Sequence, residues 1–209
     1  MDQRRIMGLI LAGGASRRFG ADKRHALLDG RSLLERVIER ARPQVGDLLV
    51  NTNQLNIDRQ AASLECLSDD APEEGPIAGV LAGLAAAGSR GFTLLASFAC
   101  DTPFFPTDTV AHLAAALRAS TADYAVASCG TIAHRIFALW NVQCRSRLGH
   151  AFTKGARSMR EVEHWLEPTW ADFPDGGGPN GDPFFNINTP AELETAQQWL
   201  VAQCGATKY

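Results

Sequence analysis

A glycine-rich segment that also carries basic residues runs from Leu11 to Lys23 and reads LAGGASRRFGADK. It directly follows a short apolar run near the start of the chain. The adjacent Gly13 and Gly14 let the backbone approach a ligand closely, and successive N–H groups in such a loop can bind an anion. Arg18 and Lys23 add positive charge beside these groups. Together these residues predict a binding site for a triphosphate.

The spacing of this segment separates it from two other phosphate-binding motifs. The Walker A pattern GxxxxGK[ST] is absent, and so is the dinucleotide-binding pattern GxGxxG. The second absence argues against a dinucleotide-dependent oxidoreductase. The alternative for the segment itself is a glycine turn with solvated basic residues. Because the glycine-rich segment directly follows the first predicted strand, the phosphate site is the favoured interpretation.

A second candidate site lies in Phe98–Pro106, which reads FACDTPFFP. Asp101 stands directly after an apolar run, and its carboxylate is a hard oxygen ligand of the kind that Mg²⁺ combines with substrate phosphates. The alternative is that Asp101 only caps the turn. Thr107 is better placed to cap the following helix, so we predict that Asp101 binds Mg²⁺.

The elements that must position these residues alternate between short apolar runs and amphipathic segments. Such alternation predicts one domain with three α/β/α layers, Rossmann-like, around a mostly parallel central sheet. Ligands of such sheets bind at the carboxyl ends of the strands, so we expect the site after Leu11, Val50 and Ala99. We expect strands at Ile6–Leu11, Asp47–Val50, Leu64–Leu67, Phe92–Ala99, Tyr124–Ser128 and Ile136–Trp140, and helices at Ser32–Ala41, Pro76–Ala87, Thr107–Arg118, Ser158–Leu166 and Pro190–Gln203.

Composition limits the class of protein. The chain has 209 residues, 45% of them hydrophobic and 21% charged, with a formal net charge of −3. These values suit a single domain over residues 1–209 and give no electrostatic argument for nucleic acid or an anionic membrane. The first apolar run is too short for a signal peptide, and no stretch reaches the ~18 apolar residues of a membrane span. Five scattered cysteines without a CxxC pair argue against disulfides and zinc, so we expect a cytoplasmic protein.

Three further motifs accompany the glycine-rich segment: GPIAG at 75–79, CDTPF at 100–104 and FNINTPAEL at 185–193. In this order the four motifs resemble the molybdenum cofactor guanylyltransferase family, over residues 8 to about 195. That family belongs to the glycosyltransferase-A-like nucleotidyltransferases, which implies their fold. The first motif alone is shared with sugar-nucleotide pyrophosphorylases and with the cytidylyltransferase of the same pathway.

The resemblance implies transfer of GMP from GTP to the terminal phosphate of molybdenum-loaded molybdopterin, with Mg²⁺ and release of pyrophosphate. It implies that Arg18, Lys23 and Asp101 are catalytic and that Asp101 also binds the metal. The first part of the chain, about 1–105, would bind nucleotide, and the second, about 106–209, the acceptor. The implied nucleotide-binding residues are Leu11, Ala12, Gly13, Gly14, Lys23, Asn51, Asp69 and Asp101, and the implied acceptor-binding residues are Asn186 and Asn188.

An acidic residue before GPIAG aligns with a nucleotide contact of the family. Asp69 is the first choice, with the adjacent Asp70 possible because loop length varies there. Guanine presents an N–H and an amino group on one edge, so one carboxylate can accept two hydrogen bonds from it. Adenine lacks this donor pair. On composition alone, a solvated acidic loop is the better interpretation of SDDAPEE.

The late motif predicts both a helix start and a substrate contact. Thr189 would cap the helix that begins at Pro190, while Asn186 and Asn188, two residues apart, would project to the same side.

Two features depart from the family pattern. Many members have His-Pro-Thr where this chain has Ala133-His134-Arg135, although Arg135 could still meet an acceptor phosphate. The glycine-rich Asp175–Asp182 is expected to be a flexible surface loop.

Other functions stay open at this point. A cytidylyltransferase or a sugar-1-phosphate nucleotidyltransferase would keep the chemistry and change the substrates, and a non-catalytic nucleotide-binding module would keep only the binding. The family also implies cofactor-donor proteins and client molybdoenzymes as partners. A monomer or weak homo-oligomer is expected.

Overall fold

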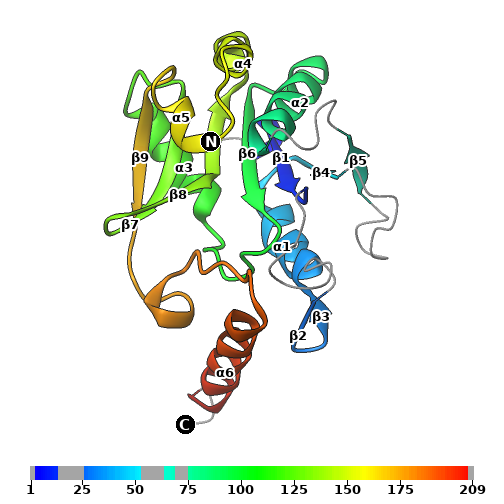
Figure 1. Ribbon diagram of the computed structural model, residues 1–209, viewed down its shortest axis with the longest axis vertical. Coiled ribbons are helices and arrows are strands. Elements are labelled where there is room, and N and C mark those ends of the chain that lie inside the picture. Colours follow the sequence, from blue (N-terminus) through cyan, green and yellow to red (C-terminus); the bar gives the residue numbers. More distant parts are fainter. Residues whose placement is uncertain (1–2, 14–25, 53–63, 69–74, 207–209) are drawn as a thin grey trace.

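Within the described residues, 3–13, 26–52, 64–68 and 75–206, the computed structural model forms one seven-stranded sheet (Figure 1). The strand order is β5-β4-β1-β6-β8-β7-β9. A separate two-stranded sheet joins β2 and β3. The strands are β1 (Ile6–Leu11), β2 (Leu27–Leu28), β3 (Arg31–Ser32), β4 (Asp47–Asn51), β5 (Glu65–Leu67), β6 (Leu94–Ala99), β7 (Tyr124–Cys129), β8 (Ile132–Asn141) and β9 (Pro168–Phe173).

The sheet is parallel except around one strand. β1 pairs in parallel with β4 and β6, β4 with β5, and β7 with β9, whereas β8 runs antiparallel to both of its neighbours. All six residues of β1 are buried. Strands covered on both faces need apolar side chains on both faces, which is why β1 is a continuous apolar run.

Helices cover both faces of the sheet. Alternate residues of β1 belong to different clusters: Ile6 and Ile10 pack with α1 and α3 on one face, and Met7 and Leu9 pack with α2, α4 and α5 on the other. The predicted three-layer fold is therefore confirmed. The helices are α1 (Leu33–Ala41), α2 (Pro76–Ser89), α3 (Thr109–Arg118), α4 (Arg145–Thr153), α5 (Met159–Val162) and α6 (Pro190–Ala206), with short 3-10 helices η1 (Gln3–Arg5), η3 (Arg42–Gln44), η5 (Val142–Cys144) and η6 (Pro179–Gly181).

The last helix lies apart from these layers. Figure 1 shows α6 beyond the end of the sheet toward which β1 and β6 point, near the β2–β3 hairpin. It is held there by a small apolar cluster that includes Leu28, Phe104 and Ile187, and the ring of Phe104 lies 4.9 Å from that of Trp199. Residues from both ends of the chain thus meet at the carboxyl ends of the strands.

Several predicted boundaries are corrected by the structure. The α3 helix begins at Thr109 after Asp108, so Thr107 does not cap it. Instead, Thr109 donates from its backbone N–H and its hydroxyl to the carbonyl of Pro106, which forms a turn before the helix. The α2 helix continues through Gly88 to Ser89, and α5 ends at Val162, before the predicted Leu166.

The sequence did not predict the short β2–β3 hairpin, and it did not predict two longer elements, α4 and β9. β9 lies at the edge of the sheet and alternates between exposed and buried residues from Trp170 to Phe173, so it lacks the apolar run of a central strand. Apolar residues are sparse in α4, RSRLGHAFT, and only Leu148 and Ala151 are buried. Among the described residues, no helix has the length and apolar character needed to cross a membrane.

Candidate active site

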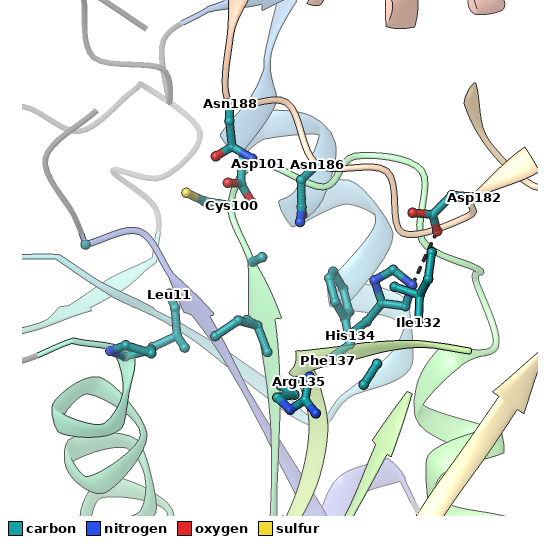
Figure 2. Close-up of a pocket in the computed structure, with 15 residues that line it drawn as sticks. Leu11, Cys100, Asp101, Ile132, His134, Arg135, Phe137, Asp182, Asn186 and Asn188 are labelled. Atoms are coloured by element: carbon teal, nitrogen blue, oxygen red, sulfur yellow. Dashed lines mark ion pairs between the residues drawn. The ribbon is translucent and has the colours of Figure 1, made fainter. Parts of the chain in front are cut away.

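A pocket of about 410 Å³ opens at the carboxyl ends of β1 and β6 (Figure 2). Its walls come from the ends of these two strands, the first half of β8 and the segment before α6. This is the edge of the sheet at which the sequence predicted the site. The lining residues are Leu11, Gly13, Pro76, Ala99, Cys100, Asp101, Ile132, Ala133, His134, Arg135, Ile136, Phe137, Asp182, Asn186 and Asn188.

The reversed direction of β8 explains how its first half reaches the pocket. In an antiparallel strand the amino-terminal end lies beside the carboxyl ends of its neighbours. β8 pairs with β6 only from Asn141 back to Ala138. On its other side the register with β7 shifts at a bulge, because Val126 pairs with Ala138 but Ala127 pairs with His134. Bulges of this kind redirect side chains, and this one lies in the pocket wall.

A buried serine stabilises the irregular backbone at this bulge. The hydroxyl of Ser97, on β6, lies 2.6 Å from the carbonyl oxygen of Ile136 and donates to it. The indole N–H of Trp140 in turn donates to Ser97 Oγ over 3.1 Å. Ser97 and Trp140 are almost completely buried. Buried polar groups are costly when unpaired, so this chain of hydrogen bonds helps to fix the pocket floor.

Asp101 lies directly after β6 and is tied to the segment before α6. Its backbone carbonyl accepts the N–H of Ile187 over 2.9 Å. The hydroxyl of the fully buried Thr102 lies 3.3 Å from Asp101 Oδ1 and also hydrogen-bonds to Asn186 Oδ1. The CDTPF and FNINTP motifs, more than eighty residues apart, therefore form one structural unit.

The two asparagines of the late motif lie at this unit. Asn186 is exposed and Asn188 half-buried, and Figure 2 shows both beside Asp101. The predicted helix start is confirmed, because Thr189 Oγ1 accepts the N–H of Glu192 over 3.2 Å. The Glu192 carboxylate accepts the N–H of Asn188 over 2.8 Å, which fixes the backbone beside the pocket.

The other predicted residues at the ends of β1 and β4 lie close to one another. Leu11 and Gly13 line the pocket. Ala12 and Asn51 are buried beside it, and the N–H of Ala12 donates to the carbonyl of Asn51 over 2.9 Å. The Asn51 amide donates to the carbonyl of Leu67 over 3.1 Å and thereby links β4 to β5.

The remaining predicted residues lie outside the residues that the structure describes. They are Gly14, Arg18, Lys23, Asp69 and its alternative Asp70. Their predicted roles stay predictions.

The structure adds two side chains that the sequence did not single out, His134 and Asp182. His134 is buried against the ring of Phe184, with 4.7 Å between ring centroids, and its Nε2 lies 3.4 Å from Asp182 Oδ1. Burial lowers the pKa of His134 below its usual 6.5, and the nearby Asp182 carboxylate opposes part of that change. The neutral imidazole is therefore favoured.

The segment that carries Asp182 does not lie wholly on the surface. Gly178 and Pro179 are buried, and a β-carbon at position 178 would come within 2.1 Å of the Asp182 carbonyl oxygen. The Asp175–Asp182 loop thus folds back tightly on itself and brings Asp182 to the pocket. The expectation of a surface loop is wrong at this end of it.

Arg135 lines the pocket and is paired with a residue that does not line it. Its Nε donates to Glu163 Oε1 over 2.6 Å, and both side chains are mostly buried. The guanidinium is held in place by this pair, and its other N–H groups still carry positive charge at the pocket wall.

The described part of the chain offers few side chains that could bind a metal ion at this pocket. No group of three or more His, Cys, Asp or Glu side chains that could hold a metal ion lies among the described residues. Mg²⁺ does not need such a group, because it keeps several waters and binds through one or two carboxylates together with substrate phosphates. Asp101, half-buried at the pocket edge, suits a metal that arrives with a nucleotide.

Comparison with known proteins gives a consistent result. The family model described as the MobA-like NTP transferase domain matches residues 8–169. The molybdenum cofactor guanylyltransferase of Rhizobium meliloti (strain 1021) is 40% identical over 201 residues, covering 92% of this chain and 90% of that protein. The protein of the same name from Bradyrhizobium sp. (strain ORS 278) is 37% identical, with 92% of each chain covered.

Solved structures share the fold at lower identity. The molybdopterin-guanine dinucleotide biosynthesis protein A of Archaeoglobus fulgidus superposes with a TM-score of 0.70 at 24% identity, covering 94% of this chain and 99% of that one. A CMP:2-keto-3-deoxy-manno-octonic acid synthetase in complex with CTP gives a TM-score of 0.73 at 12% identity, covering 95% and 99%. Similarity at this level bears on the fold alone.

Proposed function

The chain belongs to the MobA-like NTP transferase domain family and is a nucleotidyltransferase, and we propose that it transfers GMP from GTP to the terminal phosphate of molybdenum-loaded molybdopterin. The observation that carries this proposal is the pocket in which the CDTPF and FNINTP motifs meet. It occurs in a chain whose relatives named molybdenum cofactor guanylyltransferase match along nearly its whole length.

The nucleotide is proposed to lie at the ends of β1, β4 and β6. Leu11, Ala12, Gly13 and Gly14 would contact it through the backbone, and Asn51 would lie near the base. Arg18 and Lys23 would neutralise the triphosphate, and Asp69 or Asp70 would accept the two hydrogen bonds of the guanine edge.

Mg²⁺ is proposed to bind at Asp101. When bound, the ion would offset the negative charge that develops on the phosphate oxygens. The hydrogen bonds of Thr102 and Ile187 hold the neighbouring backbone and side chains in place before substrate arrives. Such preorganisation reduces the reorganisation that the reaction requires.

The reaction is an in-line displacement. An oxygen of the acceptor phosphate forms a bond to the α-phosphorus of GTP, and the bond from that phosphorus to the β-phosphate oxygen breaks. Pyrophosphate leaves with the electron pair. The attacking phosphate is already ionised at neutral pH, so the protein has only to hold two anions in line and to screen their charge.

The acceptor is proposed to occupy the other end of the pocket, beside Asn186 and Asn188. Their amides can donate to and accept from a polar ligand. This division places the nucleotide with about residues 1–105 and the acceptor with about residues 106–209. Cofactor-donor proteins and client molybdoenzymes would supply the acceptor and use the product.

The test measures pyrophosphate release from each ribonucleoside triphosphate with Mg²⁺ and molybdopterin. We expect turnover with GTP only, and a loss of at least ~100-fold in Asp101→Ala, which removes charge stabilisation in the reaction. Asp108→Ala is the matched control, because Asp108 is exposed and makes no capping hydrogen bond.

Other outcomes would identify the alternatives. Turnover with CTP would assign a cytidylyltransferase, and turnover with sugar 1-phosphates but not with molybdopterin would assign a sugar nucleotidyltransferase. Binding of GTP without turnover on any acceptor would indicate a non-catalytic nucleotide-binding module.

A further inference from the structure

One ring nitrogen of a buried histidine at the β8 end of the pocket has no hydrogen-bond partner among the described residues. The side chain of His134 is only 7% exposed, and its Nε2 has no hydrogen bond among the residues that the structure describes. Buried polar atoms without a partner are rare in native proteins, because the unpaired group loses its hydration without compensation. His134 also lines the pocket, so a ligand there could supply the partner.

The neighbouring carboxylate is oriented by the backbone. Asp182 Oδ1 accepts the N–H of Phe184 over 2.7 Å and lies 3.4 Å from His134 Nε2. No residue in the described part of the chain hydrogen-bonds to its Oδ2. The side chain is 26% exposed and lines the pocket, so this oxygen can accept from a ligand.

The Asp182 carboxylate and the His134 imidazole together present two hydrogen-bond acceptors and one hydrogen-bond donor side by side. The complementary ligand edge carries two adjacent N–H donors and one carbonyl acceptor. A 2-amino-4-oxo ring has this edge: the exocyclic amine, the ring N–H next to it and the carbonyl beyond. Pterins have such a ring, and so does guanine.

We propose that Asp182 accepts hydrogen bonds from the amine and ring N–H of the acceptor's pterin, with His134 beside it as donor to the ring carbonyl. This inference rests on the proposed function and names the residues that would select the acceptor. Figure 2 shows the pair on the side of the pocket opposite Leu11, with Asp101 and Asn186 toward its upper part.

The strand order favours the pterin over guanine as the ligand of this pair. The strand order is β4-β1-β6-β8, and Asp101 follows β6. Asn51, at the end of β4, lies on one side of Asp101, and His134, on β8, lies on the other side. The nucleotide is proposed to lie with Asn51. The acceptor then occupies the β8 end of the pocket. Guanine would bind to the carboxylate of Asp69 or Asp70, and the pterin would bind to that of Asp182.

Two further observations suit a planar ring at this place. Ile132 lines the pocket and is 56% exposed, which leaves an apolar surface for a ring to cover. Because burial lowers the pKa of His134, its ring is neutral at pH 7 and one nitrogen carries a proton that can be donated.

The test compares two ligands that differ at one group. The phosphate monoester of 6-hydroxymethylpterin carries the amine, and the corresponding lumazine phosphate carries a carbonyl there, which would face the carboxylate. Dissociation constants come from quenching of ligand fluorescence. We expect the wild-type protein to prefer the pterin by at least ~10-fold, since an unpaired buried acceptor costs about that much.

Two variants separate the proposed contacts. In Asp182→Asn the amide can donate to the lumazine carbonyl, so the preference should fall to about one or reverse. His134→Phe keeps the ring stack on Phe184 but removes the donor to a carbonyl that both ligands share. It should weaken both ligands by a similar factor and leave the preference unchanged. Asp172→Asn, an exposed carboxylate on β9, is the control and should match the wild type.

A second comparison excludes guanine as the ligand of Asp182. Discrimination between GTP and ITP, which lacks the amine, should be the same in the wild type and in Asp182→Asn. Loss of the discrimination between GTP and ITP in Asp182→Asn would overturn the inference. An unchanged preference of this variant for the pterin phosphate over the lumazine phosphate would also overturn it. If the wild-type protein fails to guanylylate molybdopterin, the proposed function is wrong. If the wild type is active but Asp182→Asn has the same ligand preference as the wild type, only the inference about Asp182 is wrong.

Discussion

Gly79 on α2 lies against the side chain of Asn51 at the end of β4. A β-carbon at position 79 would come within 2.4 Å of Asn51 Oδ1 and 2.7 Å of Leu11 Cδ2. The last glycine of the GPIAG motif thus allows the helix to approach the ends of two neighbouring strands. The proposed base site depends on this close contact.

The first prediction concerns this contact. Gly79→Ala should displace the Asn51 amide, lower the free energy of unfolding by about 1–3 kcal/mol as in other overpacked cores, and raise KM for GTP. Denaturant unfolding and steady-state kinetics would measure the two effects. Gly149→Ala in α4 is the matched control, because its nearest neighbour is 3.9 Å away and alanine favours a helix. Equal stability of the two variants would contradict the prediction.

The second prediction concerns the floor of the pocket. Ser97→Ala removes the donor to the Ile136 carbonyl and the acceptor of the Trp140 N–H. Two buried groups then lose their partner, which should cost about 1–3 kcal/mol in the free energy of unfolding. Because the bulge forms the pocket wall, KM for the acceptor should rise more than KM for GTP.

The control for that experiment is Ser89→Ala, since Ser89 is exposed at the end of α2. A stable Ser97→Ala protein with unchanged acceptor kinetics would show that the bulge does not depend on this serine.

The third prediction concerns the link between Asp101 and Asn186. Thr102→Val keeps the shape of the buried side chain but removes its hydrogen bonds to both residues. We expect kcat/KM to fall by ~10-fold or more, because the two motifs are no longer held in register. Thr153→Val in α4 removes an exposed hydroxyl and serves as control. An unchanged kcat/KM in Thr102→Val would mean that the backbone alone positions Asp101.

The fourth prediction concerns pH. The pKa of His134 in the folded state lies below its unfolded value of 6.5, so the unfolded state binds the proton more tightly. The neutral ring therefore makes its full contribution to the free energy of unfolding above pH 6.5. This contribution is lost as the pH falls from 6.5 through the pKa of the folded state. The midpoint of thermal unfolding should fall over this range in the wild type.

The variant His134→Phe should lose this part of the pH dependence, while His112→Asn, at an exposed histidine, should keep it. A slope that is the same in His134→Phe and in the wild type would assign the pH dependence to other groups.

The sequence predicted most of the fold because local signals and burial agree there. Ile6–Leu11 is apolar on both faces, as a central parallel strand must be, and Ser32 forms a capping box with Glu35 at the start of α1. The edge strand β9 and the weakly apolar α4 carry no such signal. Their conformation depends on contacts with the rest of the sheet.

The site was predictable only where a sequence motif marks it. Asp101, Asn186 and Asn188 were each singled out through their motifs, and the structure places them around one pocket. His134 and Asp182 were not, because their proximity depends on the direction of β8 and on the folding back of the Asp175–Asp182 loop. Strand direction is a property of the pairing, and no local pattern in His134 or its neighbours encodes it.

The reversed strand also affects how such an enzyme can change during evolution. β7 and β8 form a hairpin, and the turn between them, which contains Gly130 with a φ of +54°, opens near the pocket. A hairpin can gain or lose residues at its turn, whereas a parallel strand cannot be altered without its crossover helix. In the proposed arrangement, small insertions at this turn would alter the acceptor side of the pocket and leave unchanged the strands proposed to bind the nucleotide.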